Sequence, residues 1–232
     1  DGYRPELLEG TDKAERLRLA MESELAAHPG DPYASAKLGG LLISEGQHAR
    51  AIPLLRSGLE QATGPGSERY ELLLHLALAL TPTDPASAVD CYRQALAIPL
   101  DQRVSLGARI NLAARLMDMG QLDEALQLTQ AATQAAPEVA LGWANLGLMQ
   151  RQKGNIAAAL EAYSRAINLD PRNATCHQNH AVARLLGGDI EGARSSFRSA
   201  IQLFREQGRD REAQALRDKA QGLVKLDVEP II

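Results

Sequence analysis

Three side chains that could bind a metal ion lie within five residues of one another, in the stretch "CHQNH". They are Cys176, His177 and His180, and thiolate sulfur and imidazole nitrogen are ligands that zinc prefers. A tight site also needs a fourth ligand and an open geometry. We therefore expect these side chains to pack as polar groups between helices, with a metal site as the alternative, and we assign no metal ligand.

Motifs of catalysis are missing from the sequence. It contains no Gly-rich phosphate loop, no HExxH, no paired CxxC and no nucleophile elbow. Carboxylates such as Asp123 and Glu124 in "LDEAL" fit the solvent-facing side of a helix better than an acid–base pair. The sequence thus indicates a non-catalytic chain with no cofactor.

The composition favours helices and excludes several classes of function. Of the 232 residues 45% are hydrophobic and 3% aromatic, and Ala and Leu dominate. A net charge of -4 argues against nucleic acid as a partner. No apolar run reaches the roughly 20 residues that span a bilayer. Cys91 and Cys176 have no CxxC spacing, which is typical of thiols in a reducing compartment, so we expect a cytoplasmic location.

A repeat organises the chain. In the stretch from Gly142 to Pro171, large and small residues hold fixed places, and they recur 34 positions later and 34 positions earlier. Two further copies precede these at a spacing of 37. A period of 34 is the signature of a helix–turn–helix array. Five repeats are predicted, with starts near Pro32, Arg69, Leu106, Ala140 and Ala174.

The pattern has a physical basis. Small residues at the eighth, twentieth and twenty-seventh positions allow helices to approach closely, and larger ones at the fourth, seventh and twenty-fourth fill the gaps. Gly at the fifteenth position suits a left-handed helix C-cap. In the second repeat "TPTDP" replaces this Gly as the turn.

These residues resemble the tetratricopeptide repeat. The resemblance implies an all-α fold, a right-handed superhelical solenoid of five helix–turn–helix units with an N-terminal helix and a C-terminal capping helix. One helix is predicted to close at Pro29, and the capping helix to place Ala213, Leu216, Ala220 and Leu223 on one face. The expected segments are 1–31 (linker and helix), 32–68, 69–105, 106–139, 140–173 and 174–207 (repeats), and 208–232 (capping helix and tail).

The resemblance also implies a concave groove lined by the first helix of each repeat. Its sixth position faces the groove in the family, and here it holds Asn111, Asn145 and Asn179. Each amide has one acceptor and two donors, enough to bracket a peptide bond. Helices about 10 Å apart would grip about every third residue of an extended chain that rises about 3.3 Å per residue. This arrangement resembles the asparagine ladder of O-linked N-acetylglucosamine transferases. Alternatively, the amides bond within the array.

Only three of the five repeats have asparagine at the sixth position, because Lys37 and Leu74 hold this position in the first and second repeats. Ala36 and Gly40 replace the Lys and Asn of the carboxylate clamp found in chaperone-binding relatives, which disfavours a ligand held by its terminal carboxylate. The other groove-facing positions of the fourth repeat hold Leu141, Leu148, Arg151 and Gln152.

The amino end resembles the segment that joins a family 2 glycosyltransferase domain to C-terminal tetratricopeptide repeats in bacterial proteins. The matching elements are Gly2-Tyr3, a basic helix around 13–25, and "PGDPY" at 29–33. A start at Asp1 without Met fits a piece of a longer protein. The chain has no DxD motif, so the resemblance implies that any sugar transfer resides upstream.

Three functions are compatible with these features. The favoured one is a scaffold whose groove binds a protein or an extended peptide. The second is an accessory domain of a larger glycosyltransferase, presenting an acceptor or a partner. The third is a self-assembly module, which would make the chain a homo-oligomer.

Overall fold

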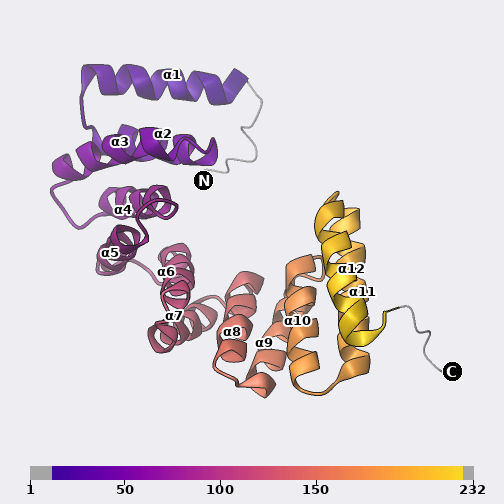
Figure 1. Ribbon diagram of the computed structural model, residues 1–232. Coiled ribbons are helices and arrows are strands. Elements are labelled where there is room, and N and C mark those ends of the chain that lie inside the picture. The colour runs from indigo at the N-terminus through magenta and orange to yellow at the C-terminus, as the bar shows by residue number, and fades with distance from the viewer. Residues whose placement is uncertain (1–11, 227–232) are drawn as a thin grey trace. The chain divides into compact units, whose positions relative to one another are not determined.

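The described part of the chain is entirely helical. A computed structural model describes residues 12–226, and these residues form α-helices and no strand (Figure 1). The predicted all-α class is therefore confirmed. The helices are α1 (Asp12–Ala27), α2 (Pro32–Ser44), α3 (His48–Gln61), α4 (Ser67–Leu80), α5 (Pro85–Leu96), α6 (Leu106–Asp118), α7 (Leu122–Ala135), α8 (Ala140–Gln152), α9 (Ile156–Leu169), α10 (Ala174–Leu186), α11 (Ile190–Glu206) and α12 (Asp210–Val224).

The chain divides into two compact units, one ending at Arg115 and the next beginning at Leu116. Within the first unit α1 packs on α2, α2 on α3, α3 on α4 and α4 on α5, and α2 also contacts α4. Within the second unit each helix from α7 to α12 packs on the next, and α8 also contacts α10. Each unit is thus built from contacts between helices that are close in sequence.

Glycines close most of the turns within helix pairs. Gly46, Gly120, Gly154 and Gly188 have φ values of 73°, 77°, 82° and 82°, the left-handed region that residues with a Cβ rarely adopt. The N–H of the next residue then bonds to a carbonyl five residues back, for example Asn155 to Gln150 at 2.9 Å. This is the Schellman geometry that ends a helix. The predicted role of Gly at the fifteenth position is confirmed.

The turn between α4 and α5 works without glycine. The N–H of Asp84 donates to the carbonyl of Leu80 at 2.8 Å, and the Asp84 carboxylate accepts from the N–H of Ser87 at 3.1 Å. Asp84 is therefore the N-cap of α5, and Pro85 follows at the first helical position, where its missing N–H costs nothing. "TPTDP" forms the turn as predicted.

The small residues lie where helices meet. The twentieth and twenty-seventh positions are buried in all five pairs of helices from α2 to α11. Their residues are Ala51, Gly58, Ala88, Ala95, Ala125, Ala132, Ala159, Ala166, Ala193 and Ala200. The twenty-fourth position holds larger buried residues: Leu55, Tyr92, Thr129, Tyr163 and Phe197. The predicted division between small and gap-filling positions is thus confirmed there.

One expectation for α12 is wrong. Ala213, Leu216 and Ala220 are buried against α11 as predicted, but Leu223 is 58% exposed. Val224 is buried in its place at 2% exposure. At about 100° per residue, position 224 returns to the direction of 213 and 220, whereas 223 lies at the edge of this face, near the direction of 216, and in the last turn of α12 that edge is exposed.

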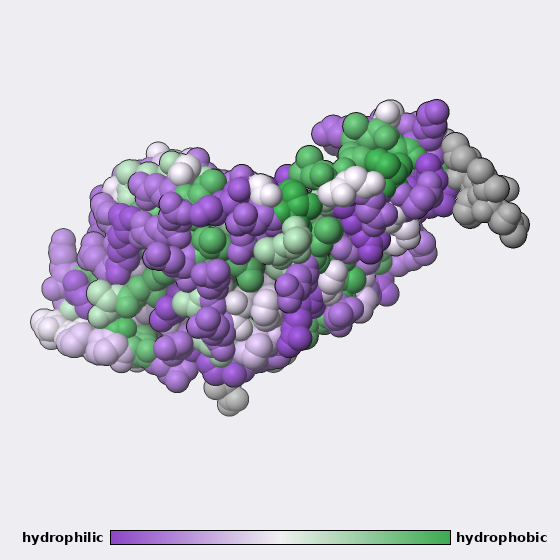
Figure 2. All heavy atoms as spheres, turned by 90° about the horizontal axis from the view of Figure 1, so that it is seen from below, coloured by the Kyte–Doolittle hydropathy of each residue, from purple (hydrophilic) through white to green (hydrophobic). Residues whose placement is uncertain are grey.

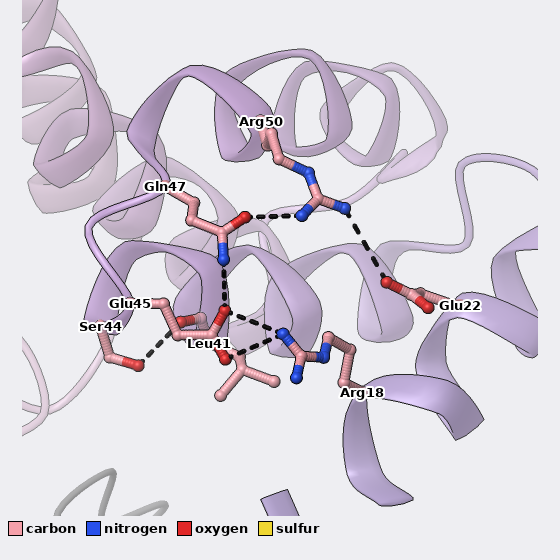
Figure 3. Close-up of polar contacts among 7 residues, drawn as sticks. All are labelled: Arg18, Glu22, Leu41, Ser44, Glu45, Gln47 and Arg50. Carbon is pink, nitrogen blue, oxygen red and sulfur yellow. Dashed lines mark hydrogen bonds and ion pairs between the residues drawn. The ribbon is translucent and has the colours of Figure 1, made fainter. Parts of the chain in front are cut away.

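Polar contacts hold α1 against the first helix pair. Arg18 donates to both carboxylate oxygens of Glu45, at 3.1 and 3.3 Å, and Gln47 donates to the same carboxylate at 2.7 Å (Figure 3). Arg50 bonds to Gln47 at 2.6 Å and lies 4.0 Å from Glu22 of α1. No side chain of 15–27 is fully buried, so this contact is made largely by exposed and half-buried polar groups. Gly2-Tyr3 and the tail from 227 onward lie outside the described residues.

Candidate functional site

Two of the three predicted asparagines share the second unit. Asn145 lies on α8 and Asn179 on α10, and these two helices contact each other. Both side chains are half-buried, and neither carboxamide makes a hydrogen bond within residues 12–226. Each therefore retains a donor and an acceptor for a ligand.

The first unit offers a different surface at the same repeat position. Asn111 lies on α6 and is half-buried with no side-chain hydrogen bond among the described residues. Lys37 of α2 is already engaged: its ammonium bonds to Glu71 at 2.8 Å and lies 5.4 Å from the ring centre of Tyr33. Leu74 is half-buried. At the sixth repeat position the unbonded amides are thus those of Asn111, Asn145 and Asn179, whereas Lys37 is engaged by Glu71.

The other residues predicted for the groove differ in exposure. Leu141 is 51% exposed, and Gln152 is exposed as well. Leu148 is half-buried and packs against the core cluster that contains Tyr163 and Cys176. Leu141 is therefore free to contact a ligand, whereas much of the surface of Leu148 already contacts the core.

Arg151 has an unexpected neighbour. Its Nε is buried and makes no hydrogen bond, and the same holds for the hydroxyl of Tyr163, a residue with 0% exposure. Burial raises the pKa of Tyr163, and the Arg151 guanidinium opposes this shift, first through its closeness to hydrogen-bonding range of the hydroxyl and then through its charge. Among the described residues no carboxylate pairs with Arg151. The sequence could have suggested the proximity, because Arg151 follows Gly147 by four residues and so shares its helix face toward Tyr163.

The three side chains first considered for a metal point to different partners. The Cys176 thiol is buried 3.9 Å from the Tyr163 carbonyl, and burial raises its pKa to about 12. Nε2 of His177 lies 3.0 Å from the carbonyl of Pro171. Nε2 of His180 lies 3.5 Å from the Ser164 hydroxyl, and burial lowers the His180 pKa to about 4. Within residues 12–226 no three His, Cys, Asp or Glu gather as a metal site. The side chains pack as polar groups between helices.

A polar hollow of about 300 Å³ lies between α9, α10 and α11. His177, His180 and Arg184 of α10 line it, together with serines of the flanking helices. Arg184 is hydrogen-bonded to α11, since its guanidinium donates to the Gly192 carbonyl at 3.0 Å and to the Ser196 hydroxyl at 3.2 Å. The hydrogen-bonding capacity of Arg184 is therefore already largely used within the fold.

Comparison with known sequences identifies the repeat type. Residues 140–173 match the family model described as tetratricopeptide repeat. These residues form α8 and α9, the pair that carries Asn145, Arg151 and Tyr163. The fold is all-α and of the tetratricopeptide-repeat type. A TPR repeat-containing protein of Synechococcus elongatus is 39% identical over 223 residues, which is 96% of this chain and 55% of that protein. The chain thus spans about half the length of this curated relative.

Further similarities extend to a larger protein and to solved structures. The human protein O-mannosyl-transferase TMTC1 is 27% identical over 168 residues, 72% of this chain and 19% of that protein. MamA of Desulfovibrio magneticus RS-1 has a TM-score of 0.66 at 22% identity, covering 76% of this chain and 97% of that one. YrrB, described as a TPR protein with an unusual peptide-binding site, has a TM-score of 0.62 at 17% identity, covering 84% of this chain and 98% of that one. At these identities the two structures show a shared fold.

None of the described helices is long and apolar enough to cross a lipid bilayer.

Proposed function

We propose that the chain is a non-catalytic scaffold of five tetratricopeptide repeats that binds an extended protein segment along the first helices of its repeats. The observation that carries this proposal is the pair of unbonded carboxamides of Asn145 and Asn179, one on each of two contacting helices. A peptide backbone presents both an N–H and a carbonyl per residue, and each amide can bond to both. Such contacts are independent of the ligand's side chains.

The neighbouring side chains supply selectivity. Leu141 exposes about half of its surface on α8 and can contact an apolar ligand residue. Arg151 carries a charge that no described carboxylate neutralises, which favours an acidic residue in the ligand. The description of YrrB as a peptide-binding protein supports the same class of ligand for this fold. The ligand that fits is an extended segment with mixed apolar and acidic side chains.

A random peptide library displayed on phage tests the proposal without a known ligand. The wild-type chain is expected to enrich peptides, and replacing Asn145 and Asn179 together by Ala should weaken binding of an enriched peptide about tenfold or more. Asn168→Ala is the matched control, because Asn168 is an exposed asparagine on α9, a second helix of its pair. Thermal melting of all variants should agree closely, since these amides make no bond within the fold. Equal affinity of the double variant and the control would refute the role of the amides.

A second candidate function is that of an accessory domain in a sugar-transferring protein. The resemblance of residues 2–33 to the segment that follows family 2 glycosyltransferase domains supports it, as does the similarity to a protein named as an O-mannosyl-transferase. In that case the repeats would present the acceptor. An immunoblot with an antibody against this chain measures the mass of the native gene product. A band near 25.0 kDa would refute this candidate. A much larger product should transfer sugar, and removal of the repeats should lower transfer to a protein acceptor.

A further inference from the structure

A second hollow, of about 420 Å³, lies between α11 and α12. It is formed by different helices from those that carry Asn145 and Asn179. Its wall is mainly apolar, because Ile201 and Leu226 contribute to it and because long side chains such as Arg205 expose their carbon stems. Figure 2 shows apolar side chains gathered at the right-hand end of the view, where the C-terminal helices lie. The hollow therefore suits an apolar occupant.

Most charged side chains around the hollow are already engaged. Nε of Arg198 donates to the Leu226 carbonyl at 3.2 Å. Glu206 accepts a hydrogen bond from Gln202 at 2.9 Å, and Arg217 has an interaction partner of its own. The occupant is thus selected by apolar contact rather than by pairing with these charges.

The chain itself runs toward this hollow after α12. Lys225 ends the helix with a φ of 49°, in the left-handed region, and so turns the chain. Just before this turn, the Val224 carbonyl accepts a hydrogen bond from Nε of Arg194 at 2.8 Å. Just after it, the Leu226 carbonyl accepts from Arg198, which lies one turn further along α11. The chain at Leu226 is therefore heading along α11, in the direction of that helix and into the hollow.

The next residues have the pattern of a half-buried extended segment. Residues 227–232, which lie outside the described part of the chain, read Asp-Val-Glu-Pro-Ile-Ile. Successive side chains of an extended chain point to opposite sides, and Leu226 is buried at 5% exposure. Every second residue after it is apolar: Val228, Pro230 and Ile232. The first two residues of the other side are acidic, Asp227 and Glu229. Pro230 favours this form, since it fixes its own φ near −65° and biases the preceding residue toward an extended conformation.

The length of the segment also fits. An extended residue advances about 3.3 Å and a helical residue about 1.5 Å, so two residues of the segment pass about four residues of α11. With Leu226 held at Arg198, Val228 comes near Gln202. Two residues later the segment reaches Glu206, which lines the hollow at the end of α11.

We propose that residues 227–232 bind in this hollow as an extended C-terminal strap. Val228 and Pro230 cover the apolar wall beside Ile201, and the acidic residues lie on the opposite side of the strap. A segment on a short tether has an effective concentration on the order of millimolar, which favours it over a separate peptide or a second copy. The strap would extend the packing of α12 on α11 and cover apolar surface at the C-terminal end of the second unit.

Disulfide trapping in the full 232-residue chain tests the position of the strap. Gln202→Cys combined with Val228→Cys should form an intramolecular disulfide under mild oxidation, because disulfide-bonded Cα atoms lie about 4.4–6.8 Å apart. Gln202→Cys with Glu229→Cys is the matched control, since its tether is one residue longer but position 229 points away from α11. This control should close about tenfold more slowly. The natural Cys91 and Cys176 are buried and should stay out of the reaction.

Two results of the trapping experiment would overturn the proposal. Equal rates of closure in the two variants would show that the segment presents no fixed side to α11. A disulfide between two chains, seen as a band of twice the mass on a non-reducing gel, would assign the hollow to a second copy.

Thermal melting tests the apolar contact independently. Val228→Ser should lower the midpoint of unfolding by about 2–4 °C, because it removes a half-buried aliphatic group. Ile231→Ser is the matched control, since position 231 lies on the side of the acidic residues, and it should melt as the wild type does. Equal midpoints for the two variants would contradict the strap.

Discussion

Gly147 faces the ring of Tyr163 so closely that a Cβ at position 147 would lie 2.7 Å from two ring carbons. Tyr163 is fully buried in a core cluster formed by residues of α8, α9 and α10. The contact joins the two helices of the pair that matches the tetratricopeptide repeat model. The absence of a side chain at 147 is therefore a requirement of packing.

Gly147→Ala should destabilise the protein by about 1–3 kcal/mol, because the added methyl group overpacks a filled core. Gly222→Ala is the control, since a Cβ at that position of α12 meets nothing within 4 Å. In an exposed helix Ala is more stable than Gly by about 0.5–1 kcal/mol, so the control should gain stability. Urea unfolding followed by circular dichroism measures both changes. A Gly147→Ala variant as stable as the wild type would show that α8 and α9 can separate at little cost.

Two buried tyrosines should respond in opposite ways to loss of their hydroxyl. The Tyr163 hydroxyl is buried without a hydrogen-bond partner, whereas the Tyr70 hydroxyl donates to the Val104 carbonyl at 3.0 Å. Tyr163→Phe removes an unpaired polar group and should leave stability unchanged or raise it by about 1 kcal/mol. Tyr70→Phe leaves the carbonyl without its bond and should cost about 1 kcal/mol. Thermal unfolding of both variants checks the prediction. An equal loss in both would mean that the Tyr163 hydroxyl has a partner in solution, such as an ordered water.

Stability should fall as the pH is lowered toward 4, and His180 should be one cause. Burial, with the charges of Arg184 and His177 beside it, lowers the His180 pKa to about 4, below the usual value of 6.5. The unfolded chain therefore takes up a proton at a higher pH than the folded chain does. The contribution of neutral His180 to stability is fully present above pH 6.5 and is lost as the pH falls from 6.5 to 4, at a cost of at most about 3 kcal/mol.

His180→Leu isolates this effect. Leu112 and Leu146 hold the same repeat position, so Leu should fit there. Between pH 4 and 6.5 the stability of this variant should depend less on pH than that of the wild type, and the exposed His28→Gln variant should keep the wild-type slope. Parallel pH profiles of wild type and His180→Leu would exclude His180 as a source of the acid sensitivity.

The ion pair between Arg18 and Glu45 should contribute little to overall stability. Its side chains are 31% and 28% exposed, and exposed pairs contribute about 0.2–1 kcal/mol. A double-mutant cycle with Arg18→Ala and Glu45→Ala should give a coupling energy in this range, smaller at high salt. Hydrogen exchange in α1 should nevertheless speed up, because few buried contacts hold this helix. A coupling energy well above 1 kcal/mol would show that the Gln47 and Arg50 contacts act together with the pair.

The architecture was predictable because the repeat encodes it redundantly. Glycine at the fifteenth position predicts a left-handed turn from backbone sterics alone, and alanines at fixed spacing predict close helix contacts. Each of these rules predicts local structure from the residue type at a single position of the repeat. The exposed Leu223 shows where this approach is too coarse, because a shift of one residue within an amphipathic stripe decides burial.

The chemistry of the surface was less predictable. Asn145 and Asn179 could be assigned to one repeat position, but only the three-dimensional arrangement shows that their amides make no bond within the fold. The proximity of Arg151 to Tyr163 depends on side-chain rotamers across two helices, and the hollow between α11 and α12 depends on the turn at Lys225. Such features arise from contacts between elements, which a pattern along one chain does not specify.

The glycine turns also bear on how the protein is made. Each closes through a hydrogen bond that spans only five residues, so it can form as soon as its own two helices have left the ribosome. Because the helices within each compact unit pack mainly on their sequence neighbours, no early segment of a unit has to wait for a distant one. Each unit can therefore fold in the order of its synthesis, adding helix pairs one after another, with its unpacked apolar surface at the growing end.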